Sequence, residues 1–495
     1  MSSPNAILNA SEQRPTYVAG RWVTGDESLA VENPADESTV GSVTVTPLAE
    51  FRAAIDGARH SFDSGVWSGL SAADRAAVMR SFCDHVESRR EELIAAIVAE
   101  AGQPTFFAER AQVGMGLSLA RDTIDLYLSM RHEESNPVPV DQLVEARVAL
   151  SIRRHEPVGV VTAITPYNGA VIMAFQKLVP ALMAGNSVIL RPSPLTPISS
   201  LLLAEAAEAA GIPAGVLSVV VEGGSAGAEL LTTDPMVDMV SFTGSTAVGR
   251  AILAQAAPTV KRVVLELGGK SAQIYLPDAV EKVAGGAMIV IAGSAGQACV
   301  AATRMLVPED RKDDVLQMVS DTYRSFKVGP PSDPSALIGP VISAGQRARC
   351  EQFVAAAEEH GGKTVTGGRR PDGLDRGYYF EPTVLDLPDN SNPAAQEEIF
   401  GPVLGVIGYR DLDHAVEIAN DSIYGLSGQV YGADVSAATN VARRLRTGAV
   451  NVNTALFSAY APGGGYKQSG LGRERGPDGI REFQEVKHMA IGELR

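Results

Sequence analysis

The chain has 495 residues, of which 45% are hydrophobic and 20% charged, and its formal net charge is −16. This composition is typical of a globular protein with a sizeable core, and the length predicts about three domains. The excess of acidic residues argues against nonspecific nucleic-acid binding, which needs clustered Lys and Arg against phosphate.

The first predicted elements are two amphipathic helices over 72–80 and 87–100, where apolar residues recur at three- and four-residue spacing. Residues 146–153 then alternate small or apolar with polar side chains, as a ribbon strand would. From residue 157 short apolar runs alternate with helical segments, which predicts a doubly wound parallel sheet. Its strands are expected over 158–164, 187–190, 216–221 and 239–242, and its helices over 177–184, 199–210 and 250–255.

The same alternation resumes after residue 269 and predicts a second α/β domain, with the junction near Glu266. The uncharged stretch 283–302 is long enough to raise the question of a membrane span. Its many Gly and Ala residues favour a buried helix followed by a loop. The strands of this domain are expected over 272–276 and 303–307, and its helices over 280–291, 312–326, 414–420 and 437–445.

The cysteines and histidines limit the chemistry and the cellular compartment that we expect. Cys83, Cys299 and Cys350 lie far apart, which predicts no disulfide framework and a reducing, cytoplasmic location. None of the seven histidines lies in an HExxH or Cys-linked motif, so we expect no metal site. The first residues carry no basic segment followed by an apolar one, so no export signal is expected.

Two short motifs point to covalent catalysis. Cys299 follows Gly296-Gln297-Ala298, and Glu266 leads the glycine motif that ends at Lys270. A thiol becomes a strong nucleophile where its surroundings favour the thiolate, and a carboxylate in reach can activate water against the adduct. The small residues at 296 and 298 are expected to leave room for a planar carbonyl at the sulfur. The apolar run before Glu266 is expected to raise the pKa of its carboxyl toward a general-base value. Taken alone, such a cysteine is more often a small buried hydrophobe.

In this order, the two motifs resemble those of the aldehyde dehydrogenase superfamily. Further segments carry the resemblance through almost the whole chain, with Tyr167 in place of the family's Trp and Arg191 in place of its Lys. These segments are 165–168, 190–193, 242–249, 397–403, 462–470 and 472–474.

The resemblance implies an NAD(P)-dependent oxidation of an aldehyde to the acid through a thiohemiacetal and a thioester on Cys299, with Glu266-assisted hydrolysis. It implies an α/β fold with a Rossmann-type cofactor domain (1–132 and 156–266), a catalytic domain (267–475) and a small β-ribbon oligomerisation element (133–155 and 476–495). In the family this ribbon pairs with a neighbouring subunit, which predicts a homodimer or homotetramer, because an unpaired ribbon leaves its backbone groups unsatisfied.

The resemblance also assigns candidate residues. The implied catalytic residues are Cys299, Glu266, Asn168 and Lys177, with the Asn168 amide and the Cys299 N–H as oxyanion donors. Lys177 and Glu474 resemble family positions that assist proton movement or ordering, although an ordinary ion pair explains both equally well. The implied cofactor-binding residues are Thr165, Pro166, Tyr167, Arg191, Ser193, Pro194, Gly224, Phe242, Gly244, Ser245, Gly249, Leu267, Gly268, Glu398 and Phe400. The implied substrate pocket comprises Gly169, Met173, Gln176, Ala298, Phe457 and Gly463.

The substrate and the cofactor preference follow from departures from the family pattern. Small residues at 169, 292, 293 and 463 stand where the family commonly places bulky aromatics, which predicts a hydrophobic aldehyde with bulk near the carbonyl. A quaternary ammonium substrate is disfavoured, because an aromatic cage usually holds such a group. Pro194 occupies the slot where NAD-preferring relatives often carry a glutamate, so we expect NAD as the main cofactor and NADP as a usable one.

Three alternatives remain at this stage. A CoA-acylating relative would keep the thioester chemistry, but that variant typically lacks the glutamate that Glu266 supplies. A Cys–His hydrolase would leave the phosphate loop and Arg191 unexplained. A catalytically silent binding protein on the same fold is disfavoured by the intact set of Cys299, Asn168 and Glu266.

Overall fold

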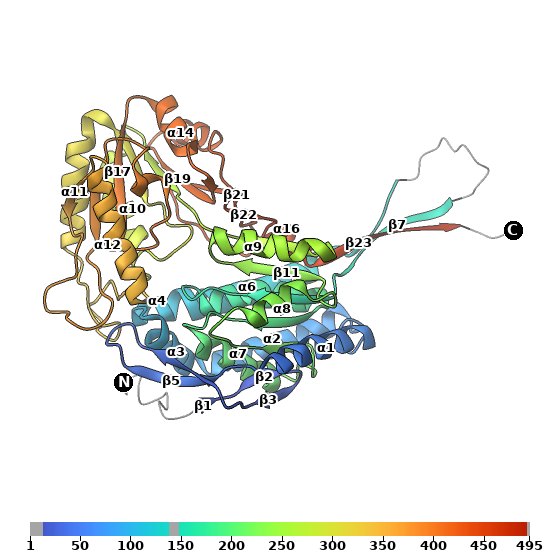
Figure 1. Cartoon of the computed structure of the whole chain (residues 1–495). Coiled ribbons are helices and arrows are strands. Elements are labelled where there is room, and N and C mark those ends of the chain that lie inside the picture. The colour runs from blue at the N-terminus through green and yellow to red at the C-terminus, as the bar shows by residue number, and fades with distance from the viewer. Residues whose placement is uncertain (1–12, 138–147, 493–495) are drawn as a thin grey trace.

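The computed structural model describes residues 13–137 and 148–492. Two large sheets, each with helices on both faces, make up most of the chain, and a thin ribbon projects from one side (Figure 1). This is the mixed α/β fold that the sequence predicted, and both large sheets are mainly parallel.

The first sheet has eight strands in the order β22-β12-β11-β8-β9-β10-β2-β3. The strands from β12 to β10 are parallel, and β22, β2 and β3 are antiparallel additions at the two edges. The bounds are β2 Thr16–Val18, β3 Arg21–Val23, β8 Val160–Ile164, β9 Ser187–Arg191, β10 Leu217–Val219, β11 Met239–Thr243, β12 Arg262–Glu266 and β22 Gly470–Leu471.

Helices cover both faces of this sheet because successive side chains of each strand point to opposite sides. Val161 and Ala163 of β8 belong to one apolar cluster, while Val160 belongs to another. The first cluster includes residues of α2, α3, α5, α6 and α7, and the second includes residues of α1 and α8. The helix bounds are α1 Leu48–Ser64, α2 Ala72–Ser88, α3 Arg90–Ala101, α4 Thr105–Phe107, α5 Gly116–Ser129, α6 Ala170–Ala184, α7 Pro197–Ala209, α8 Ala226–Thr233, α9 Thr246–Ala256 and α16 Gly476–Glu482.

The second sheet has seven strands in the order β15-β16-β17-β14-β13-β19-β20, and only β15 is antiparallel to its neighbour. Its strands are β13 Ala272–Tyr275, β14 Arg304–Pro308, β15 Lys363–Thr366, β16 Thr383–Asp386, β17 Val403–Tyr409, β19 Ser427–Tyr431 and β20 Ala449–Val452. Its helices are α10 Val283–Ile291, α11 Lys312–Arg324, α12 Ala344–Glu359, α13 Pro393–Gln396, α14 Leu412–Asn420 and α15 Val435–Ala442. In the described part of the chain, neither α10 nor any other helix meets the length and hydropathy of a membrane span.

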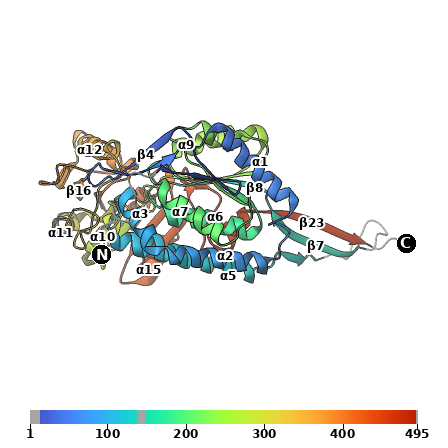
Figure 2. The same cartoon turned by 90° about the horizontal axis from the view of Figure 1, so that it is seen from below.

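Three small sheets complete the fold. β1 (Gln13–Arg14), β5 (Thr39–Thr44) and β4 (Ser28–Glu32) form one, and β18 (Tyr424–Gly425) pairs with β21 (Tyr466–Lys467). The third, of β23 (Gln484–Gly492), β7 (Val148–Pro157) and β6 (Glu133–Ser135), is the projecting ribbon, which both views show (Figures 1 and 2).

One sequence argument about this ribbon is wrong. The strand predicted over 146–153 was expected to need a neighbouring subunit for its backbone hydrogen bonds. Instead, β7 is the middle strand, with β23 on one side and β6 on the other. Over Ile152–Arg154 the backbone of β7 therefore has partners on both sides within the same chain, and the outer edges of the sheet belong to β6 and β23. Residues 146 and 147 lie outside the described residues.

Candidate active site

The candidate site lies where the parallel strands of the first sheet end. Thr243 of β11 lies opposite Glu266 of β12, so the two strands end level with each other. In open α/β sheets, ligands bind at the carboxyl ends of the strands. The Cys299 loop reaches this edge, because a Cβ at Gly269 would lie 2.5 Å from the Cys299 carbonyl oxygen. The structure therefore brings the Glu266 and Cys299 motifs into direct contact.

The Asn168 amide is fixed beside the cysteine loop. Its Nδ2 donates to the carbonyl oxygen of Gln297 at 2.8 Å, two residues before Cys299. An amide carries two N–H groups, so the second can face an oxyanion. Gln297 is itself held, since its Nε2 donates to the Ser294 carbonyl at 3.0 Å and its Oε1 accepts from the Tyr167 hydroxyl at 3.1 Å.

Two glutamines that the sequence analysis did not single out donate hydrogen bonds to the backbone of Asn168. Gln103 and Gln112 each donate through Nε2 to the backbone carbonyl of Asn168 at 2.8 Å. Both side chains are buried, and Gln112 lies in a π-helical segment, Ala108–Met115. Such segments are rare and occur frequently at functional sites. No local motif marks these glutamines, which precede Asn168 by 65 and 56 residues.

The surroundings of Cys299 hold its thiol in the protonated form. Burial raises the pKa of this half-buried thiol to about 12, and the Glu266, Glu398 and Glu474 carboxylates add to the effect. This differs from the thiolate-favouring environment expected from the sequence, because burial disfavours the charged thiolate and the nearby carboxylates repel it. Attack on a carbonyl therefore needs a group that accepts the thiol proton.

Glu266 is suited to accept a proton near neutral pH. Burial raises the pKa of its carboxyl to about 8, and the charge of Glu474 adds to this. Its Oε1 is buried and has no hydrogen-bond partner among the described residues. A Cβ at Gly464 would lie 2.8 Å from this atom, so a glycine at 464 leaves space for the carboxyl. A base with a pKa near the working pH is the efficient choice for general-base catalysis.

Lys177 and Glu474 form a buried ion pair close to this base. Lys177 Nζ lies 2.6 Å from Glu474 Oε1 and also donates to Ser241 Oγ at 3.0 Å. Their side chains are 0% and 5% exposed. The ion pair that the sequence offered as one explanation of Lys177 and Glu474 is therefore present. The Glu474 carboxylate lies near enough to raise the pKa of Glu266.

The ends of β8 and β11 leave polar atoms for a ligand. The Oγ1 atoms of Thr165 and Thr243 are buried and have no partner among the described residues. Gly244 and Ser245 follow β11, and Ser245 Oγ caps α9 by accepting from the Val248 backbone N–H at 3.4 Å. The exposed first turn of α9 suits an anion, because its N–H groups and the helix dipole point outward.

Two glycines let this loop pack closely. A Cβ at Gly249 would lie 2.6 Å from Leu267 Cδ2, and one at Gly244 would lie 2.4 Å from Phe242 Cζ. Helix α9, which follows the loop, therefore packs directly against the Glu266 turn.

Pro166 lies between Thr165, which directly follows β8, and Tyr167, on the same edge of the sheet.

Two further predicted cofactor-binding residues, Glu398 and Phe400, also lie at this edge. Glu398 Oε1 accepts the Gly269 N–H at 2.8 Å, and burial raises the pKa of its carboxyl. A Cβ at Gly268 would lie 2.5 Å from Glu398 Oε2, so only a glycine admits the carboxyl here. Phe400 has a φ of 63°, which is costly for a bulky L residue, and its ring meets that of Tyr167 edge-on at 6.0 Å. The unpartnered hydroxyls, the open helix start and this carboxylate together fit a nicotinamide dinucleotide.

Arg191 is paired with a carboxylate that the sequence did not reveal. Its Nη2 donates to the Gly224 carbonyl at 2.9 Å, and its Nε lies 3.4 Å from Glu222 Oε1. Glu222 is buried and accepts two backbone N–H groups at the start of α8. Ser193 and Pro194 continue from Arg191, and the Ser193 Oγ accepts a backbone N–H at 3.3 Å. The guanidinium is therefore partly neutralised before any phosphate arrives.

The predicted substrate residues lie around a small apolar cluster. Met173 and Phe457 pack in it, and a Cβ at Gly169, just before α6, would lie 2.8 Å from Met173 Cγ. Ala298 precedes Cys299, and Gln176 lines an adjacent pocket. The buried core of the cluster is Leu119, Ile172 and Ala459.

The expectation of open space is wrong at two of the small residues. A Cβ at Gly293 would lie 2.0 Å from the Phe107 ring, and one at Gly463 would lie 2.3 Å from Arg475 Nη2. Phe107 and Arg475 therefore fill what the sequence suggested was empty, and neither was singled out as a site residue.

The structure gives Gly296 a role that the sequence did not indicate. Gly296 has a φ of 73°, and a Cβ there would lie 2.1 Å from the Gly401 carbonyl oxygen. This glycine is required by its own backbone conformation and by the close approach to Gly401.

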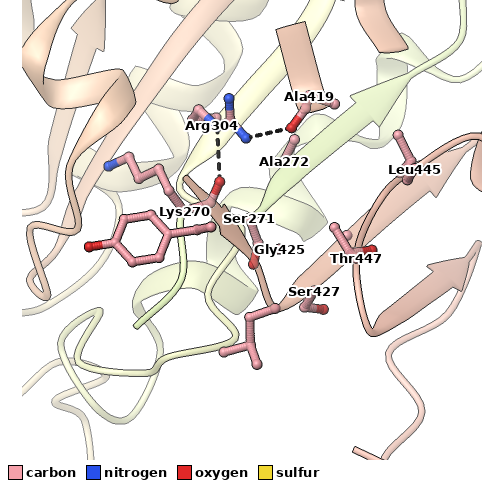
Figure 3. Close-up of a pocket in the computed structure, with 12 residues that line it drawn as sticks. Lys270, Ser271, Ala272, Arg304, Ala419, Gly425, Ser427, Leu445 and Thr447 are labelled. Atoms are coloured by element: carbon pink, nitrogen blue, oxygen red, sulfur yellow. Dashed lines mark hydrogen bonds between the residues drawn. The ribbon is translucent and has the colours of Figure 1, made fainter. Parts of the chain in front are cut away.

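A buried arginine anchors the Glu266 turn to the second sheet. Arg304 Nε donates to the Lys270 carbonyl and Nη2 donates to the Ala419 carbonyl, both at 2.9 Å (Figure 3). Its Nη1 donates to Asn390 and Ile418, also at 2.9 Å. A small pocket lies beside this network. Arg304 thereby fixes the turn that carries the candidate base.

The remaining cysteines have no comparable setting. Cys83 and Cys350 are buried and free, and burial raises the pKa of each thiol to about 12. Over residues 13–137 and 148–492, no group of three or more His, Cys, Asp and Glu side chains could hold a metal ion.

Comparisons with known proteins agree with this geometry. The family model described as "Aldehyde dehydrogenase family" matches residues 22–489. Geranial dehydrogenase from Castellaniella defragrans is 37% identical, and the match covers 96% of this chain and 98% of that protein. The 3-succinoylsemialdehyde-pyridine dehydrogenase of a Pseudomonas species is 39% identical with the same coverage.

A solved crystal structure is also similar to this chain. The crystal structure of a mutant of aldehyde dehydrogenase C from Pseudomonas syringae, in complex with NAD+ and octanal, superposes with a TM-score of 0.91. It is 37% identical, and the match covers 96% of both chains.

Proposed function

Because the chain belongs to the aldehyde dehydrogenase family, we propose that its site oxidises an aldehyde to the carboxylic acid on Cys299 and that Glu266 activates the releasing water. As a family member, the chain is an oxidoreductase that acts on aldehyde groups. The observation that carries the assignment of residues is the contact between the two motifs, with Gly269 against the Cys299 carbonyl.

In the proposed first half-reaction, the Cys299 sulfur attacks the aldehyde carbon and its proton passes to a base. Glu266, with a carboxyl pKa of about 8, is the group suited to accept it. The oxyanion that forms accepts from Asn168 Nδ2 and the Cys299 backbone N–H. Collapse of this thiohemiacetal with loss of a hydride leaves a thioester. The nicotinamide ring of NAD, when bound, supplies the acceptor for that hydride.

In the second half-reaction, Glu266 first releases to solvent the proton that it took from the thiol. It then takes a proton from water while the water oxygen attacks the thioester carbonyl. The C–S bond breaks, and the proton on Glu266 passes to the departing sulfur, which releases the acid and restores the Cys299 thiol. Deprotonated Glu266 is needed for this step, so its raised pKa predicts that turnover increases as the pH rises through about 8. The buried pair of Lys177 and Glu474 fixes the charge near the base throughout.

The direct test is NADH formation by the purified chain with a panel of aldehydes, with and without coenzyme A. We expect NADH formation that needs no coenzyme A and releases the free acid. A strict requirement for coenzyme A would favour the acyl-transfer alternative. The absence of aldehyde-dependent NADH, with a thiol that still alkylates, would favour a silent binding protein.

We propose hydrophobic aldehydes as the substrate class. The apolar cluster of Met173, Phe457 and Leu119 supplies a lining for such a chain. Geranial and octanal, named for two similar proteins, have this character. Because Phe107 and Arg475 fill two of the expected gaps, we base the proposal on this lining rather than on empty slots.

We propose NAD as the main cofactor and NADP as a weaker one. Pro194 places no carboxylate where a 2′-phosphate would be repelled, which supports use of NADP. Glu222 beside Arg191 works against it, because it already neutralises the cation. The kcat/KM for both cofactors in wild type and in Pro194→Glu tests this. An NAD preference above about a thousandfold in wild type, unchanged by the glutamate, would contradict it.

We propose a homodimer or homotetramer assembled through the ribbon. Exposed apolar side chains lie along it, with Val486 60% and Ile491 47% exposed, and β23 presents a free edge. β20 is an edge strand of the second sheet, so its outer edge can pair with the ribbon of another copy. A monomeric mass at micromolar concentration would contradict this proposal.

The domain division is likewise a proposal, with the cofactor domain over 1–132 and 156–266 and the catalytic domain over 267–475. Ile480 and Phe483 pack in the core of the first sheet, so we place α16 with that domain rather than with the ribbon. Limited proteolysis that released the ribbon but left 476–483 attached to the first domain would support this placement.

A further inference from the structure

Gln297 connects the cysteine loop to the strand end that carries Asn168. Its backbone carbonyl accepts the Asn168 amide at 2.8 Å, two residues before Cys299. Its buried side chain is held at both ends, since Nε2 donates to the Ser294 carbonyl and Oε1 accepts the Ile342 N–H, each at 3.0 Å. The position of Cys299 relative to Asn168 therefore depends on how firmly Gln297 is held.

The Tyr167 hydroxyl adds a third contact to this side chain, at 3.1 Å from Gln297 Oε1. The contacts with Ser294 and Ile342 allow only one orientation of the amide, with its oxygen toward Ile342. The phenol must therefore be the donor, and burial raises the pKa of Tyr167, so the hydroxyl keeps its proton. In the family pattern a tryptophan stands at this position, so the hydroxyl is a departure from that pattern.

Tyr167 and Asn168 contact Gln297 at two different points. The Tyr167 hydroxyl binds its side chain, and the Asn168 amide binds its backbone. A single hydrogen bond leaves the joined groups free to turn about it, whereas two bonds from adjacent residues also fix their relative orientation. The opposite side of the turn is fixed as well, because Gln103 and Gln112 both donate to the Asn168 carbonyl. The hydroxyl therefore completes a two-point attachment between the Asn168 turn and the cysteine loop.

The ring of Tyr167 has a separate contact. It meets the ring of Phe400, a proposed cofactor-binding residue, edge-on with the two centroids 6.0 Å apart. Replacing the tyrosine by phenylalanine keeps the aromatic ring and removes only the hydroxyl. A cofactor role of the ring and a positioning role of the hydroxyl can therefore be measured separately.

From these contacts we propose that Tyr167 is a positioning residue for the first half-reaction. Through Gln297, its hydroxyl holds the cysteine loop so that the Asn168 amide and the Cys299 N–H are directed at one oxyanion. Donors that are fixed before the reaction stabilise such a charge without reorganisation, and small misplacements are costly. This inference rests on the proposed aldehyde oxidation and adds to it a residue that acts without touching the substrate.

The first test compares wild type with Tyr167→Phe. We expect kcat with octanal and NAD to fall about tenfold, the order expected when one hydrogen bond of a positioning network is lost. The KM for either compound should stay within about twofold of wild type, because neither binds to the hydroxyl. Hydrolysis of p-nitrophenyl acetate without cofactor should fall by a similar factor, because this ester also forms an oxyanion on Cys299 but transfers no hydride.

The second test is a double-mutant cycle with Gln297→Met, which removes the acceptor of the Tyr167 hydroxyl. In this background Tyr167→Phe should change kcat by less than about twofold, because the hydroxyl has lost the group through which it acts. The cycle separates action through Gln297 from a general effect of the hydroxyl on folding. Where Gln297→Met does not fold, the ester assay on Tyr167→Phe still decides.

The matched control is Tyr409→Phe. Tyr409 is also buried, and its hydroxyl donates to the Tyr275 carbonyl at 2.7 Å within the core of the second sheet. This variant loses a buried tyrosine hydrogen bond of the same kind. Its Tm should therefore fall, while kcat and ester hydrolysis stay at their wild-type values.

Three outcomes would overturn the proposal. One is a Tyr167→Phe kcat equal to that of wild type, and another is the same loss of kcat in the wild-type and Gln297→Met backgrounds. The third is a loss of NADH formation with unchanged ester hydrolysis, which would assign the Tyr167 hydroxyl to the cofactor site. If wild type itself forms no NADH with any aldehyde, the proposed oxidation fails, and that result is distinct from failure of the positioning role.

Discussion

The nucleophile end of the site and its substrate wall are built in different ways. At the nucleophile end, Cys299, Glu266 and Asn168 stand on strand ends and short loops, and backbone contacts such as Gly269 against Cys299 hold them together. The wall combines side chains of α5, α6, α16 and the segment around Phe457. The first region depends on a few local motifs, whereas the second depends on which side chain fills which gap.

This difference decides what the sequence could predict. The carboxyl ends of adjacent parallel strands lie at one edge of the sheet, so residues that follow the predicted strands β8 and β11 could be placed together from the sequence. The six strands predicted for the two large sheets were located within a few residues, whereas β12, β16, β17, β19 and β20 were not predicted. Helix α6 was predicted to begin at 177 but starts at Ala170, because it is apolar on nearly every side and shows no periodicity at its start.

The remaining features depend on contacts between distant segments. Gln103 and Gln112 reach Asn168 from far along the chain, and Glu222 pairs with Arg191 through a fold-dependent contact. A glycine is equally ambiguous, because it signals either open space or a close neighbour. The sequence therefore suggested an empty slot at Gly463, where the structure has the Arg475 guanidinium.

Removing the Cys299 thiol should have the largest effect on activity, and it tests the nucleophile end of the site. We expect Cys299→Ala to lower turnover by about 10⁴-fold or more while cofactor binding remains, because the other described thiols lie in buried core positions. Steady-state NADH formation and NAD titration by fluorescence check this. Cys83→Ala is the matched control and should keep activity while losing thermal stability. Retention of a tenth of wild-type turnover would show that Cys299 is not the nucleophile.

Removing the Asn168 amide, the proposed oxyanion donor, should have the second-largest effect on turnover. We expect Asn168→Ala to lower kcat by about 10²–10³-fold, since the amide that we propose as a preorganised oxyanion donor is lost. Gln112→Ala, which frees the Asn168 carbonyl without touching the amide, should cost less. Pre-steady-state NADH formation measures the step directly. Equal losses in both variants would mean that the Asn168 side chain has no role beyond structure.

Changing the wall should alter selectivity rather than chemistry. Gly169→Phe adds a ring against Met173, which can move because its side chain is flexible. We expect kcat/KM for octanal to fall about tenfold relative to acetaldehyde. A panel of linear aldehydes measures this ratio, and Gly169→Ala serves as the smaller control. A ratio that stays constant would place position 169 outside the substrate path.

The smallest expected effect concerns stability. The folded carboxyl of Glu266 has a raised pKa of about 8, so the folded chain binds this proton more tightly than the unfolded chain does. The stability that this provides is complete at low pH and is lost as the pH rises through about 8. Glu266→Gln does not titrate, so its Tm should increasingly exceed that of wild type between pH 5 and pH 9. A constant Tm difference across this range would contradict the pKa assignment.

The central claim is that Glu266 releases a thioester formed on Cys299. Rapid mixing of Glu266→Gln with NAD and a good aldehyde tests it, because an amide cannot take the proton from water. We expect a burst of NADH close to one equivalent per active site, slow steady turnover, and an acyl group on the peptide that carries Cys299 by mass spectrometry. The account would be contradicted if the NADH burst rate and the steady-state rate fell together and no acyl group were found on the Cys299 peptide.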